Sequence, residues 1–160
     1  MRRERVALQV GALADAQRWS EAFAKRFPSD ALASDVAYIR AESTLQLGQH
    51  ESASTAFEQL IAAEPKNAMR SSWETRLAAA RYLSGEYEKA LELTTKAIKE
   101  KQESMARAES LFLQGASLLK LDKLDLAIDA LQKSNQSNSK WGQADEVLLI
   151  LAEAQSTGGK

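Results

Sequence analysis

Cysteine is absent from the 160 residues, and the sequence has only one histidine, two prolines and seven glycines. The lack of cysteine excludes disulfides, thiolate metal ligands and cysteine nucleophiles. A single histidine, His50, cannot build a usual zinc site, and its place in a short turn indicates a packing role. The scarcity of proline and glycine leaves room for long helices, which the many Ala, Leu, Glu, Gln, Lys and Arg residues favour.

Charge of one sign and long apolar runs are also missing. The net charge is −1 and basic residues alternate with acidic ones, so we expect no binding of nucleic acid. No stretch reaches the roughly 18 apolar residues of a membrane span, so we expect none. Residues 2–14 are only a weak match to a signal peptide, because Gln9 interrupts them and Asp15 and Arg18 follow. The compartment therefore stays open between cytoplasm and periplasm.

No grouping of residues indicates catalysis. Gly158 and Gly159 open no helix and form no phosphate-binding loop. Serines and threonines are scattered without a suitable base, and no buried setting is visible that would raise the pKa of a carboxyl group. We therefore predict that the chain is not an enzyme, with no catalytic residues, no cofactor and no metal site.

A 37-residue recurrence is the strongest positive feature. Gly48, Gly85 and Asp122 are spaced by 37 residues, and each stands in a short polar turn. An alanine follows each of them five residues later, and a small residue precedes each by seven. The alanines are Ala53, Ala90 and Ala127, and the small residues are Ala41, Ala78 and Gly115. Small side chains at these positions would let two successive helices approach closely.

Between the turns, apolar residues recur at the i, i+3, i+4, i+7 spacing of an amphipathic helix. This spacing predicts nine helices, at residues 3–14, 18–27, 31–47, 50–63, 69–84, 87–101, 104–121, 124–136 and 143–155. Short loops make successive helices antiparallel neighbours. The chain is therefore predicted to be one all-α domain over residues 1–160. It divides into a weak repeat (3–30), three repeats (34–67, 71–104 and 108–141) and the first helix of an incomplete or capping unit (143–155).

The pattern resembles the tetratricopeptide repeat (TPR), whose units are antiparallel helix pairs of about 34 residues. The small residues that this family has at positions 8 and 20, and its turn near position 15, match Ala41, Ala53 and Gly48. The resemblance implies a right-handed α-solenoid of antiparallel helix pairs, with about nine helices, that binds proteins. The longer period, with Phe27-Pro28 ahead of a long helix, looks like the repeats of bacterial envelope proteins such as outer-membrane assembly lipoproteins.

The resemblance also implies a partner-binding face, because the first helix of each TPR unit lines a concave groove. The matching residues are Tyr38, Glu42, Leu45, Thr75, Ala79, Tyr82, Phe112, Ala116 and Leu119. Aromatic anchors among polar groups suit the centre of an interface, so we expect a peptide or helix of a protein partner here. The alternative is that Tyr82, Leu83 and Leu119 pack between repeats. Glu42 and Glu109 stand where some relatives hold a ligand carboxylate, so we expect no carboxylate clamp.

Residues 147–151 are five consecutive apolar residues near the C-terminus. A helix that is apolar on all sides needs burial on more than one side, and the preceding repeat covers only one. We therefore expect self-association, or continuation of a longer repeat protein, through Val147, Leu148, Ile150 and Leu151. The alternative is a plain terminal cap.

Overall fold

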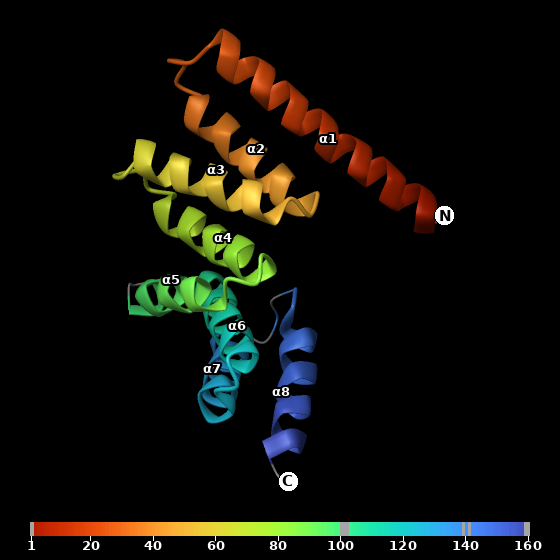
Figure 1. Ribbon diagram of the computed structural model, residues 1–160, viewed down its shortest axis with the longest axis vertical. Helices are drawn as coiled ribbons and strands as arrows, with labels where there is room; N and C mark the ends of the chain where they lie inside the picture. Colours follow the sequence, from red (N-terminus) through yellow and green to blue (C-terminus); the bar gives the residue numbers. More distant parts are fainter. Residues whose placement is uncertain (1, 100–102, 139, 141, 159–160) are drawn as a thin grey trace. The chain divides into compact units, whose positions relative to one another are not determined.

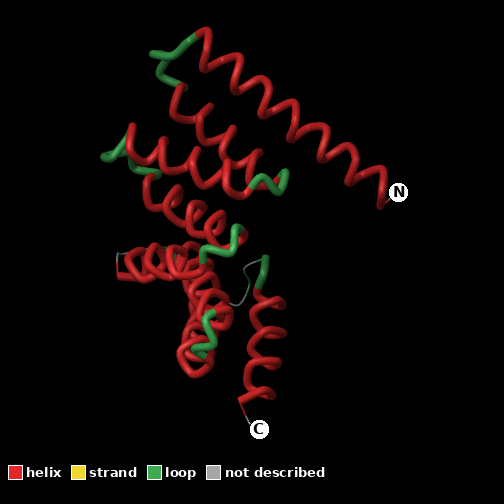
Figure 2. The backbone as a smooth tube through the Cα atoms, viewed as in Figure 1, coloured by secondary structure: helices red, strands yellow, loops and turns green. Residues whose placement is uncertain are grey.

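The computed structural model describes residues 2–99, 103–138, 140 and 142–158, which form eight helices and contain no strand (Figures 1 and 2). The helices are α1 (Arg2–Arg26), α2 (Ala33–Gln46), α3 (His50–Ala63), α4 (Arg70–Leu83), α5 (Tyr87–Lys99), α6 (Ser104–Lys120), α7 (Leu124–Ser137) and α8 (Ala144–Gly158). They fall into two compact units, Met1–Ala80 and Arg81–Lys160. The all-α prediction is thus confirmed for these residues.

Seven of the predicted helices match observed ones to within a few residues. The exception is the N-terminal pair, predicted at residues 3–14 and 18–27, which is the single helix α1. Residues 12–26 contain no proline or glycine, so nothing local breaks the helix before Pro28. The described residues therefore hold eight helices, not nine. Residues 100–102, 139 and 141 of the predicted repeats, together with Gly159, lie outside the described residues.

In the first unit, α1 runs alongside α2, and α2 packs against α3 (Figure 1). Phe57 is fully buried, and the small residues Ala41 and Ala53 are completely covered, as a close approach of α2 and α3 requires. The Gln17 side-chain amide of α1 donates to Thr44 Oγ1 at 3.1 Å. The core of this unit is therefore built where large and small residues of neighbouring helices interlock.

In the second unit, α6 is the central element, since it packs against both α5 and α7, and α8 packs against α7. Gly115 of α6 lies directly against the fully buried Leu131 of α7. The Ser134 hydroxyl of α7 donates to the Ala108 carbonyl oxygen of α6 at 2.7 Å. This buried hydrogen bond and the glycine contact fix the spacing of the two helices.

The turns after α2, α4 and α6 share one backbone conformation. Gly48, Gly85 and Asp122 have φ angles of 78°, 80° and 57°. In each turn the following N–H donates to the carbonyl oxygen five residues earlier, as in Gln49 to Thr44 at 3.1 Å. These are Schellman motifs, which end a helix by placing one residue in the left-handed region. The structural equivalence of the three 37-residue-spaced positions is confirmed.

Replacing Asp122 with glycine is expected to raise the free energy of unfolding by about 0.5–1 kcal/mol. A residue with a side chain is strained in the left-handed region, and glycine is not. Urea unfolding followed by circular dichroism measures the change. Gly85→Ala, which introduces the same strain, should lower the unfolding free energy by a similar amount. A lower stability of the Asp122 variant would contradict the argument.

Candidate functional site

Within the first unit, most residues of the predicted partner-binding face are covered. Leu45, Thr75 and Ala79 are buried. The ring of Tyr38 is half-buried and its centroid lies 6.3 Å from that of Phe57. The buried residues therefore support the helices, and the surface that a partner could reach here is carried by Tyr38 and by the neighbouring Glu42.

Glu42 forms an ion pair with Arg76 that joins α2 to α4. Arg76 Nε donates to Glu42 Oε2 at 2.8 Å, and its NH2 group donates to Oε1 at 2.7 Å. Gln46 also donates to Glu42 Oε1, at 2.8 Å. Two parallel hydrogen bonds between one guanidinium and one carboxylate make this a bidentate ion pair, which is the strong form of an arginine–carboxylate contact. The two residues are 34 positions apart, which is the repeat length of the TPR family; this spacing is the signal that sequence reasoning missed.

Within the second unit, Tyr82 contributes a half-buried aromatic ring at the end of α4. Its ring centroid lies 5.7 Å from that of Tyr87. Burial raises the pKa of the Tyr82 phenol, and the nearby Tyr87 and the carboxylate of Glu146 raise it further. The predicted face residues Phe112 and Ala116 are buried, so they belong to the core of this unit and not to its accessible surface.

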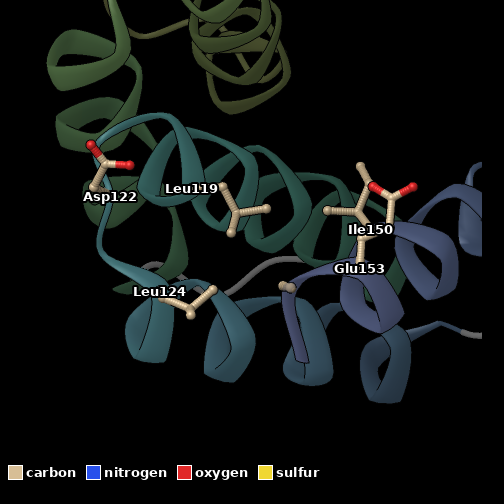
Figure 3. Close-up of a pocket in the computed structure, with 6 residues that line it drawn as sticks. Leu119, Asp122, Leu124, Ile150 and Glu153 are labelled. Atoms are coloured by element: carbon tan, nitrogen blue, oxygen red, sulfur yellow. The ribbon is translucent and has the colours of Figure 1, made fainter. Parts of the chain in front are cut away.

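The second unit contains a pocket of about 420 Å³ between α6, the start of α7 and α8. Its lining residues are Leu119, Asp122, Leu124, Ile150, Glu153 and Ala154. Figure 3 shows Leu119 lying between Asp122 on one side and Ile150 with Glu153 on the other. The pocket is therefore apolar at its centre and carries carboxylates toward its edges. Leu119 belongs both to the predicted face and to this pocket.

Helix α8 presents different surfaces on its two sides. Val147 is buried, whereas Leu148 and Leu149 are 48% and 60% exposed. Ile150 and Leu151 are half-buried. The sequence predicted α8 and the partner-binding face as separate sites, but the structure brings Ile150 of α8 and Leu119 of α6 to the same pocket. Leu148 and Leu149 therefore form a small exposed apolar patch on α8.

A charged cluster occupies the turn between α4 and α5. The carboxylate of Glu86 accepts hydrogen bonds from Lys89 Nζ at 2.6 Å and from the guanidinium of Arg81. The hydrogen bond from Lys89, and then that from Arg81, lower the pKa of Glu86 below its ordinary value of 4.5. Because this carboxyl group stays ionised at neutral pH, it accepts hydrogen bonds from both cations at the turn and carries no proton to donate.

The variant Lys89→Met is expected to raise the pKa of Glu86. Because that pKa is lowered by folding, the pairing stabilises the folded state above the ordinary pKa and is lost as the pH falls through the lowered value. Carboxyl-carbon NMR titration of wild type and variant measures the change. Lys120→Met, which alters an exposed lysine on α6, serves as the control. An unchanged Glu86 pKa in Lys89→Met would contradict the assignment.

The part of the chain that the structure describes contains neither a metal-binding cluster nor a membrane-spanning helix. Within residues 2–99, 103–138, 140 and 142–158, no group of three or more His, Cys, Asp or Glu residues is placed to hold a metal ion. In the same part of the chain, no helix combines the length and apolar character needed to cross a bilayer.

Solved structures resemble this chain over nearly its whole length. A tetratricopeptide repeat protein from Parabacteroides merdae ATCC 43184 matches with a TM-score of 0.69 and 20% identity over 92% of this chain. MamA 41-end from Desulfovibrio magneticus RS-1 matches with a TM-score of 0.66 and 19% identity, covering 96% of this chain and 91% of that one. The MamA RS-1 ArsTM double mutant matches with a TM-score of 0.67 and 17% identity, covering 96% of this chain and 91% of that one. The present chain spans 55% of the Parabacteroides protein.

These similarities confirm the tetratricopeptide-like fold. No curated protein matches the sequence. A family model described as anaphase-promoting complex, cyclosome, subunit 3 matches residues 46–134, which is more than half of the chain. Repeat proteins of this type are generally interaction scaffolds without catalytic activity. The chain therefore belongs to the family described as anaphase-promoting complex, cyclosome, subunit 3, and is a protein-interaction scaffold of the tetratricopeptide type.

Proposed function

We propose that the chain binds a segment of a partner protein in the pocket between α6 and α8. The observation that carries the proposal is the half-buried pair Leu119 and Ile150, which face one pocket of about 420 Å³. Ligand pockets are commonly concave, mostly apolar and a few hundred cubic ångströms in volume. An apolar side chain that fills such a pocket gains roughly 1.5–3 kcal/mol from the surface it buries.

The accessible aromatic residues of the predicted face extend this proposal. Tyr82 is half-buried within the same unit as the pocket, and tyrosine is favoured at the energetic centres of interfaces. In the first unit, Tyr38 and Glu42 are proposed as a separate contact of the same kind. Catalytic and nucleic-acid-binding roles are not proposed, because the sequence offers neither a catalytic constellation nor a basic surface.

Selection of peptides of about twelve residues from a random library, with the purified chain as bait, tests the proposal. Binders are then titrated by fluorescence polarisation against wild type and against Ile150→Gln. We expect the variant to weaken binding by tenfold or more, because a polar group then occupies the apolar centre of the pocket. Leu126→Gln is the matched control, since Leu126 is an exposed apolar residue of α7 that does not line the pocket. Binders with the same affinity for wild type and for Ile150→Gln would refute the pocket as the binding site.

A second candidate function is self-association through α8, or continuation of a longer repeat protein. It is favoured by the adjacent exposed side chains of Leu148 and Leu149. Sedimentation analysis of wild type and of Leu148→Asp separates this candidate from the first. A concentration-dependent dimer that Leu148→Asp abolishes, and that Leu126→Asp leaves intact, would support self-association. A wild type that stays monomeric at high concentration would exclude self-association and leave continuation of a longer repeat protein as the alternative.

A further inference from the structure

The charges on α8 have one sign. Residues 144–158 contain three carboxylates, Asp145, Glu146 and Glu153, and no lysine or arginine. Glu146, Ile150 and Glu153 follow a spacing of four and three residues, which places them along one side of the helix. Ile150 and Glu153 both line the pocket between α6 and α8. An apolar residue therefore stands on this side of α8 with a carboxylate about one turn away in each direction.

The turn between α6 and α7 adds a further carboxylate to the same pocket. Asp122 is exposed and lines the pocket from the side opposite Ile150 in Figure 3. The next residue, Lys123, lines a different cavity together with Glu88 and Leu91 of α5. Among the described residues, the two charged side chains that line the pocket between α6 and α8, Asp122 and Glu153, are therefore both acidic.

We infer that this pocket recognises a basic, partly apolar segment of the partner, in which an apolar side chain has lysine or arginine within about one helical turn. This inference rests on the proposed function. The apolar side chain would bury against Leu119, Leu124 and Ile150, and the cations would reach the carboxylates at the edge. An acidic segment would meet charges of its own sign and be rejected.

The electrostatic part of the recognition decides specificity more than affinity. The carboxylates lie at the surface, where one ion pair changes an affinity only about two- to fivefold. Screening reduces such contacts further, because the Debye length falls from about 14 Å at 50 mM salt to about 4 Å at 500 mM. The preference for basic peptides should therefore be strong at low ionic strength and weak at high ionic strength.

The test is a parallel peptide selection against wild type and the double variant Asp122→Asn, Glu153→Gln. Asparagine is chosen for Asp122 because it tolerates left-handed backbone, and circular dichroism checks folding. Wild type should enrich an apolar residue flanked by lysine or arginine. The double variant should keep the apolar preference and lose most of the basic one, since Glu146 is the carboxylate that remains on this side of α8. Its affinity for a wild-type binder should fall about four- to twentyfold at low salt. Glu92→Gln, which removes an exposed carboxylate of α5 outside this pocket, should stay within twofold.

The outcomes separate the inference from the proposed function. Binders that depend on Ile150 but are neutral or acidic would overturn the charge preference and leave the pocket as a protein-binding site. Binders whose affinity does not change in Ile150→Gln would overturn both the charge preference and the pocket as the binding site. As a positive check, Glu153→Lys should shift the selected peptides toward acidic residues, and an unshifted selection would contradict the inference.

Discussion

Replacing Gly115 with alanine is expected to lower the free energy of unfolding by about 1–3 kcal/mol. A Cβ atom at this position would lie 2.7 Å from Leu131 Cγ and 3.2 Å from the Ala127 carbonyl oxygen. Both distances are shorter than ordinary van der Waals contact, and Leu131 is fully buried, so it has no open space to move into. Forcing an extra methyl group into a packed helix interface typically costs this amount.

The same substitution elsewhere in the chain should have the opposite sign. Alanine is favoured over glycine in a helix interior by up to about 1 kcal/mol. At Gly11 of α1 a Cβ atom would meet nothing within 4 Å, so Gly11→Ala should raise the unfolding free energy by about 0.5–1 kcal/mol. Urea unfolding of both variants measures the pair of effects. If Gly115→Ala were as stable as wild type, the close approach of α6 and α7 would be wrong.

Breaking the ion pair between Glu42 and Arg76 should have the second-largest effect. The side chains are 18% and 26% exposed, so the pair is intermediate between exposed and buried ion pairs. Exposed pairs contribute about 0–1 kcal/mol, whereas removing one partner of a fully buried pair costs about 3–5 kcal/mol. We therefore expect Arg76→Gln to lower the unfolding free energy by about 1–2 kcal/mol.

A double-mutant cycle isolates the interaction itself. Combining Glu42→Gln with Arg76→Gln should give a coupling energy of about 1 kcal/mol, since the second substitution removes a contact that the first has already broken. The matched control is the pair of Lys133 and Asp129 on α7, 2.6 Å apart and more than half exposed, whose coupling should stay below about 0.5 kcal/mol. Equal coupling energies in the two pairs would show that partial burial and bidentate geometry do not strengthen the ion pair between Glu42 and Arg76.

The sequence by itself determined the local elements of this protein. Helix positions follow from the spacing of apolar residues, and the ends of α2, α4 and α6 follow from Gly48, Gly85 and Asp122, each of which takes a left-handed turn. Such features depend on a few neighbouring residues, so they can be read without knowing which helices meet. The break predicted inside α1 was wrong because a repeat pattern was extended over residues whose own composition continues a helix.

Only the tertiary structure decided which predicted site residues reach the surface and which partners they meet. Phe112 and Ala116 are buried, Glu42 is paired with Arg76, and Leu119 shares a pocket with Ile150. The amphipathic spacing tells which side of a helix is apolar, but not which residue of a distant helix faces it. That choice depends on the packing of side chains from separate helices, where a small residue such as Gly115 sets the distance.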